Sequence, residues 1–126
     1  MWRCWVTGVC EAISKWIFYP ILHYYNQTTG KLKSVDGSYC CLGVLCDIYH
    51  NETGLGKWEK TYDISDIQLT YNVDVFDCGG LLPTSVMMWA DLNGRDPKLK
   101  NGRFISYTND RGATFNEISN LIETDL

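Results

Sequence analysis

The hydrophobic residues of this chain follow two periodicities, and this mixture constrains its fold more than any other feature. Apolar residues recur at helical spacing in several segments, whereas those between residues 67 and 75 alternate with polar residues as in a half-buried strand. Helices are expected over residues 2–17, 42–52, 83–92 and 114–122. With 126 residues, the chain can form one hydrophobic core. We therefore expect a single α+β domain over residues 1–126, with about four short helices packed on a small, mostly antiparallel sheet.

Turn and capping signals mark where these elements begin and end. Gly54 is placed to end the second expected helix in a left-handed conformation. Thr114 and Glu117 have the spacing of a capping box, which predicts the start of the last helix. Further strands are expected at residues 31–35, 38–41 and 104–107, the first two joined by a tight turn.

Charge and hydropathy exclude two classes of partner. The formal net charge is −4, whereas a protein that binds duplex nucleic acid is expected to be basic. The apolar stretch at residues 16–27 contains Pro20 and is shorter than the roughly 18 apolar residues of a membrane-spanning helix. Arg3, Glu11 and Lys15 interrupt the apolar opening segment at residues 1–25, so no signal peptide is expected. The chain is therefore expected in a cytoplasm, with neither duplex nucleic acid nor a membrane as partner.

Six cysteines are distributed along the chain, and we expect all of them to be reduced: Cys4, Cys10, Cys40, Cys41, Cys46 and Cys78. A chain of this size can form its core without disulfides, and buried thiols pack as small apolar groups. The spacing does not match a structural zinc site, and no local signature pairs a cysteine with His23 or His50 for catalysis. We predict no catalytic residue, metal or cofactor, although a metal bound by Cys40, Cys41, Cys46 or Cys78 stays open.

The first 25 residues form a Trp-rich segment. Trp2, Trp5 and Trp16 fall on one apolar stripe of the expected first helix. This stripe is larger than a helix at the end of a chain normally exposes. We therefore expect it to be buried in a homo-oligomer.

A turn at residues 109–112 is the strongest candidate for ligand binding. Backbone N–H groups at the helix start that follows carry partial positive charge, and Arg111 beside them can bind a phosphate or carboxylate in a bidentate manner. Arg103 adds positive charge, and the rings of Tyr107 and Trp58 can stack on a base. The candidate ligand-binding residues are Trp58, Arg103, Tyr107, Asn109, Asp110, Arg111 and Thr114.

Turn chemistry offers a simpler interpretation of the same residues. Asn109 and Asp110 can cap a turn, while Gly112 can supply a left-handed backbone position. Arg111 would then pair with a carboxylate on the surface. Arg111 is the one residue type that turn geometry by itself does not require.

Three segments together resemble a widespread family of small uncharacterised bacteriophage and prophage proteins. They are the CCLGVL sequence at residues 40–45, the Leu82-Pro83 pair before a helix with Trp89, and the NDRGATF sequence at residues 109–115 that leads into a Glu-Ile helix. The resemblance covers residues 31–126 and leaves the Trp-rich residues 1–25 outside. It implies a phage gene product that acts in the cytoplasm of a bacterial host, and it transfers no catalytic residue.

Three functions are compatible with this combination of features. The first is a phage accessory protein of counter-defence, which binds and sequesters a nucleotide-derived immune signal of the host. The second is an inhibitor that docks on a host defence or regulatory protein through its aromatic surface. The third is a small nucleotide hydrolase. The first predicts a basic and aromatic pocket, the second a flat apolar surface, and the third convergent titratable groups. Because no catalytic motif is present, a binding protein is favoured over an enzyme.

Overall fold

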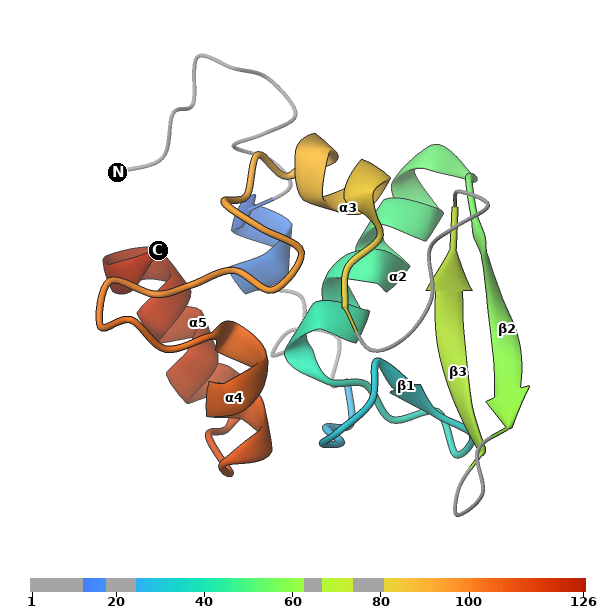
Figure 1. The fold of residues 1–126 in the computed structure, drawn as a ribbon, viewed down its shortest axis with the longest axis horizontal. Helices are drawn as coiled ribbons and strands as arrows, with labels where there is room; N and C mark the ends of the chain where they lie inside the picture. Colours follow the sequence, from blue (N-terminus) through green and yellow to red (C-terminus); the bar gives the residue numbers. More distant parts are fainter. Residues whose placement is uncertain (1–12, 18–24, 63–66, 74–80) are drawn as a thin grey trace.

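A computed structural model describes residues 13–17, 25–62, 67–73 and 81–126, and the statements below concern these residues (Figure 1). The α+β class is confirmed, as is a small antiparallel sheet with several short helices. The strands are β1 (Lys33–Ser34), β2 (Lys57–Tyr62) and β3 (Ile67–Asn72). The helices are α2 (Cys41–Thr53), α3 (Thr84–Trp89), α4 (Ile105–Asp110) and α5 (Phe115–Asp125), and residues 13–17 are also helical.

The sheet has the strand order β1-β3-β2, with both pairs antiparallel. The alternating apolar residues correctly predicted β3, whereas β2 was not predicted. Every residue of β2 except Trp58 is exposed, so the strand has no apolar alternation of its own. It forms because its backbone pairs with β3 along its length, with Trp58 opposite Tyr71.

Helix α2 lies between the sheet and the other helices (Figure 1). Its sheet-facing side contacts β3 through Tyr49 and Tyr71, whose ring centroids are 6.3 Å apart. The expected cap at Gly54 is confirmed, since this residue has φ 71° and its N–H donates to His50 O at 2.9 Å. Two other expected helices, α3 and α5, are confirmed, although α3 is shorter than residues 83–92.

The strand expected at residues 38–41 is wrong in its second half. Cys41 is the first residue of α2, and Cys40 is its N-cap, with an extended backbone and a sulfur that accepts from Gly43 N at 3.4 Å. Tyr39 keeps an isolated antiparallel bridge to Lys33. Cysteine is not among the usual N-cap residues, so the sequence contains no ordinary signal for this helix start.

The strand expected at residues 104–107 is also wrong, because residues 105–110 form helix α4. A four-residue apolar pattern does not distinguish a strand from a short helix. As a result, Asn109 and Asp110 lie within a helix and not in the expected turn. Arg111 caps the helix end, and Gly112 takes the left-handed position that was expected, with φ 103°.

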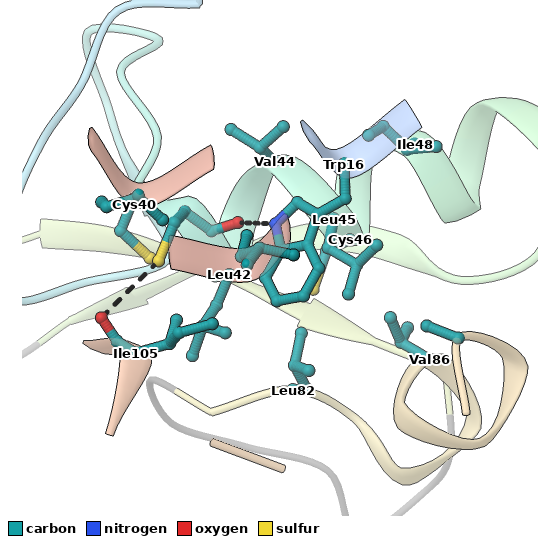
Figure 2. Packing of buried hydrophobic residues seen from close by; sticks show 14 of the residues in the cluster. Trp16, Cys40, Leu42, Val44, Leu45, Cys46, Ile48, Leu82, Val86 and Ile105 are labelled. Carbon is teal, nitrogen blue, oxygen red and sulfur yellow. Dashed lines mark hydrogen bonds between the residues drawn. The ribbon is translucent and has the colours of Figure 1, made fainter. Parts of the chain in front are cut away.

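The helical residues 13–17 are part of the core (Figure 2). Trp16 is buried, and its indole Nε1 donates to Cys41 O at 2.8 Å. Ser119 Oγ of α5 donates to Ile17 O at 2.7 Å, and Lys15 forms an ion pair with Glu52 of α2. The expectation that Trp16 lies on an oligomer surface is therefore wrong, because the protomer itself buries this ring. Trp2 and Trp5 lie outside the described residues.

Candidate functional site

Three of the predicted residues lie along one side of helix α4, and we call them the α4 face: Arg103, Tyr107 and Arg111. Residues four apart on a helix are neighbours on its surface. Arg103 lies just before the helix and Arg111 caps its end. The guanidinium carbon of each arginine is 5.7 Å from the ring centroid of Tyr107. The structure thus brings two cations to a single aromatic ring, which is 44% exposed.

The two guanidinium groups of the α4 face have no carboxylate partner in the described part of the chain. The expectation that Arg111 pairs with a surface carboxylate is therefore not met among these residues. Contact with an exposed ring contributes only about 0.5–1 kcal/mol. Although the whole chain has a formal charge of −4, the α4 face is locally positive and can bind an anion.

A second pair of an aromatic ring and a cation adjoins the α4 face. Lys98 Nζ is 5.2 Å from the ring centroid of Phe104, and this ring is 47% exposed. An isolated antiparallel bridge joins the backbones of Lys98 and Phe104. Both residues border an open cleft of about 630 Å³, which is lined by Leu81, Asn93, Gly94, Arg95, Asp96, Lys98 and Phe104.

Asn109 anchors α4 to the rest of the protein. Its side chain is fully buried, and its Oδ1 accepts from Gln27 Nε2 at 2.9 Å and from Cys41 N at 3.2 Å. Its Nδ2 donates to Thr28 O at 2.9 Å. The amide thus satisfies an N–H at the start of α2 and holds the loop before β1. These bonds give Asn109 a structural role and leave it away from the exposed α4 face.

Asp110 and Thr114 also use their polar groups within the fold. Asp110 Oδ1 accepts from Gly30 N at 2.9 Å, so its carboxylate is directed at the loop before β1. Thr114 Oγ1 accepts from Glu117 N at 3.2 Å, and Glu117 Oε1 accepts from Thr114 N at 2.9 Å. This is the expected capping box. Neither side chain is therefore needed for the α4 face.

Trp58 lies on β2, on the opposite side of the molecule from α4 (Figure 1). Its ring contacts those of Tyr39 and Tyr71, at centroid distances of 5.9 and 5.0 Å. Lys33 Nζ is 5.1 Å from the ring centroid of Trp58. The structure therefore does not bring Trp58 together with Arg111, and the ring belongs to the packing between the sheet and α2.

The described cysteines are buried thiols that are not joined in disulfides: Cys40, Cys41 and Cys46. Burial raises the pKa of Cys40 to about 11 and raises the pKa of Cys41 further above its ordinary value. At neutral pH both are protonated, and a protonated thiol is a poor nucleophile and metal ligand. The described residues contain no group of three or more side chains that could hold a metal ion. Cys4, Cys10 and Cys78 lie outside the described residues.

Three of the candidate residues named from the sequence lie together on the α4 face, although the sequence pattern was interpreted as a strand and a turn. Arg103, Tyr107 and Arg111 are spaced four apart, which is a helical signal that an interpretation as strand and turn does not use. Phe104 falls in the strand expected at residues 104–107 and is not among the candidate ligand-binding residues. The bonds that anchor Asn109 could not be predicted, because its partner Gln27 is more than 80 residues away in the chain.

These features define a small α+β protein with a basic and aromatic face, and none of its described helices is long and apolar enough to cross a membrane. The chain belongs to the family described as a domain of unknown function, DUF8296, which matches residues 11–126. This match includes the helical residues 13–17 that pack against α2 and α5. No curated protein and no solved structure matches the chain.

Proposed function

We propose that this protein binds a nucleotide-derived anion on the α4 face. The observation that supports this most is the presence of two guanidinium groups, with no carboxylate partner among the described residues, beside the exposed ring of Tyr107. A guanidinium matches the geometry of a phosphate and can donate two hydrogen bonds to it. An exposed aromatic ring can stack on a base of any sequence. Together they match the two ends of a nucleotide.

The same proposal includes a biological setting. The sequence resemblance supports a phage-encoded accessory protein that acts in the host cytoplasm, and we propose that it sequesters a nucleotide-derived immune signal there. A sequestering protein needs affinity and no catalytic group. The two guanidinium groups beside the ring of Tyr107 can supply this affinity.

The test is a thermal-shift and calorimetric screen against mononucleotides and cyclic dinucleotides. A ligand at 100 times its dissociation constant should stabilise the protein by about 2.7 kcal/mol. Arg111→Ala should weaken binding by about 1.5–3 kcal/mol and leave the fold intact, because the side chain is exposed. Lys60→Ala is the matched control, since it removes an exposed cation from β2. Full affinity in Arg111→Ala, or no binding by the wild type, would contradict the proposal.

A second candidate, a protein–protein inhibitor, is favoured by an apolar row at one end of the sheet. Tyr62 pairs with Ile67, and these side chains are 72% and 41% exposed. Val35, 55% exposed, directly follows Ser34, whose partner Gln68 directly follows Ile67. Such a patch is typical of a docking surface. A host protein that binds the wild type and Arg111→Ala but not Tyr62→Asp would support this candidate over the first.

A further inference from the structure

We infer that the α4 face is one half of a longer site, and that the whole site takes two nucleotides joined by a phosphate. The second half is formed by Phe104, Lys98 and the cleft beside them. This inference rests on the proposed function, because it extends the same site. It names the class of ligand as a dinucleotide.

The first argument is that the structure repeats the same pair of groups. Phe104 is the N-cap of α4, and Tyr107 lies in the first turn of the same helix. Both rings are close to half exposed. Each has a cation within 6 Å of its centroid, Lys98 at Phe104 and the arginines at Tyr107. Each of the two rings can stack on one base.

The second argument is the position of Arg103. This residue directly precedes Phe104 in the chain, yet its guanidinium contacts the ring of Tyr107. Its positive charge therefore lies at the ring of Tyr107, next in the chain to the residue that supplies the second ring. A phosphate that links two stacked nucleotides can bind this charge. A mononucleotide would use only one ring and would leave either Lys98 or Arg111 without a phosphate.

The third argument is the cleft that Phe104 and Lys98 border. Its volume of about 630 Å³ is within the range of small-molecule sites, and its apolar walls include Leu81 and Phe104. Its polar groups are held in place by bonds within the protein. Asn93 Oδ1 accepts from Lys98 N at 3.1 Å, and Asp96 Oδ1 accepts from Ser106 N at 3.1 Å. A base stacked on Phe104 would therefore meet acceptors and donors in fixed positions.

The inference is tested by comparing AMP with the linear dinucleotide pApA in calorimetric titrations. Stacking on one aromatic ring changes affinity about 5- to 150-fold per base. The wild type should bind pApA at least about tenfold more tightly than AMP. Phe104→Ala should remove most of this preference, so that pApA binds about as tightly as AMP. Lys98→Ala, which keeps the ring and the backbone bridge, should reduce the preference in the same direction. Met88→Ala is the control, because it removes an exposed apolar side chain from α3.

The possible outcomes separate this inference from the proposed function. Equal affinities for AMP and pApA in the wild type would overturn the dinucleotide inference and leave nucleotide binding in place. A preference for pApA that survives both Phe104→Ala and Lys98→Ala would also overturn it, because the second half of the site would then lie elsewhere. If neither ligand binds, both the inference and the proposed function are wrong.

Discussion

Gly43 is the residue at which helix α2 passes closest to another segment. A Cβ atom at this position would lie within van der Waals overlap of Leu32 O, which belongs to the backbone and cannot rotate away. The same backbone oxygen accepts from Cys40 N at 3.0 Å, so it is held at the start of the helix. The close approach therefore depends on the absence of a side chain.

Gly43→Ala is expected to lower the free energy of unfolding by about 1–3 kcal/mol, the usual cost of overpacking. At a helix position with no close neighbour, the same change would raise the free energy of unfolding by up to about 1 kcal/mol. The sign of the change therefore distinguishes the two situations. Chemical denaturation measures it. Gly94→Ala is the control, since its Cβ would meet its nearest neighbour, Asp96 O, at 3.8 Å. An unchanged or higher stability in Gly43→Ala would contradict the close approach.

The buried thiol of Cys40 makes a prediction about pH. Its pKa is raised from 9.0 to about 11 by burial, so the native state keeps its proton where the unfolded state loses it. The stability that this thiol contributes is fully present below pH 9 and is lost as the pH rises from about 9 to 11. Cys40→Ser should flatten this part of the profile, because serine keeps an N-cap oxygen and does not ionise there. Denaturation midpoints measured at intervals between about pH 9 and 11 test this prediction. Identical profiles of stability against pH for the wild type and Cys40→Ser would contradict it.

At the scale of elements, Asn109 decides where α4 sits and so where the α4 face points. Asn109→Ala leaves Cys41 N without its side-chain acceptor and Thr28 O without its donor. Each unsatisfied buried group costs about 1–3 kcal/mol. The substitution should therefore lower the free energy of unfolding by more than about 2 kcal/mol. Asn116→Ala on the exposed side of α5 is the matched control and should change it by less than about 0.5 kcal/mol.

Hydrogen exchange adds a local readout to this prediction. The amide of Cys41 should exchange faster in Asn109→Ala than in the wild type, since its acceptor is gone. Amides in the middle of α5 should exchange faster only to the extent that global stability falls. Equal stability of the two alanine variants would mean that the buried amide does not anchor the helix.

The elements that the sequence predicted are those whose signals are local. Helix α5 has its capping box, α2 has its glycine end, and β3 has its alternation, all within a few residues of the element. Strand β2 and helix α4 depend on distant partners: β2 on the backbone of β3, and α4 on Gln27, Thr28 and Cys41. Such partners cannot be read from one short segment, and both elements were missed.

The candidate site, too, was predictable only where its features follow from the local sequence. The charge and ring chemistry of Arg103, Tyr107 and Arg111 could be predicted from residue type. That Asn109 and Asp110 are turned toward the loop before β1 could not, because this depends on how α4 packs. That Trp58 lies apart from the α4 face could not be predicted either, because this depends on the pairing of β2 with β3.

At the scale of the whole molecule, the helical residues 13–17 pack against α2 and α5 and form part of the same core. They contribute a buried indole, a backbone acceptor and an ion pair to α2 and α5. We therefore expect them to unfold together with the rest of the domain and not as a separate N-terminal segment. The family match begins at residue 11 and so includes residues 13–17 in the domain.

Trp16→Phe and Trp58→Phe form a matched pair that tests this expectation. The first loses the hydrogen bond from Nε1 to Cys41 O in a buried site, so it should lower the free energy of unfolding by about 1–3 kcal/mol. The second removes an indole whose buried Nε1 has no hydrogen-bond partner among the described residues, so it should cost less than the first. Denaturation followed by both circular dichroism and fluorescence should give coincident transitions for each variant. If Trp16→Phe is no more destabilising than Trp58→Phe, or if the two probes separate, residues 13–17 are not part of the cooperative core.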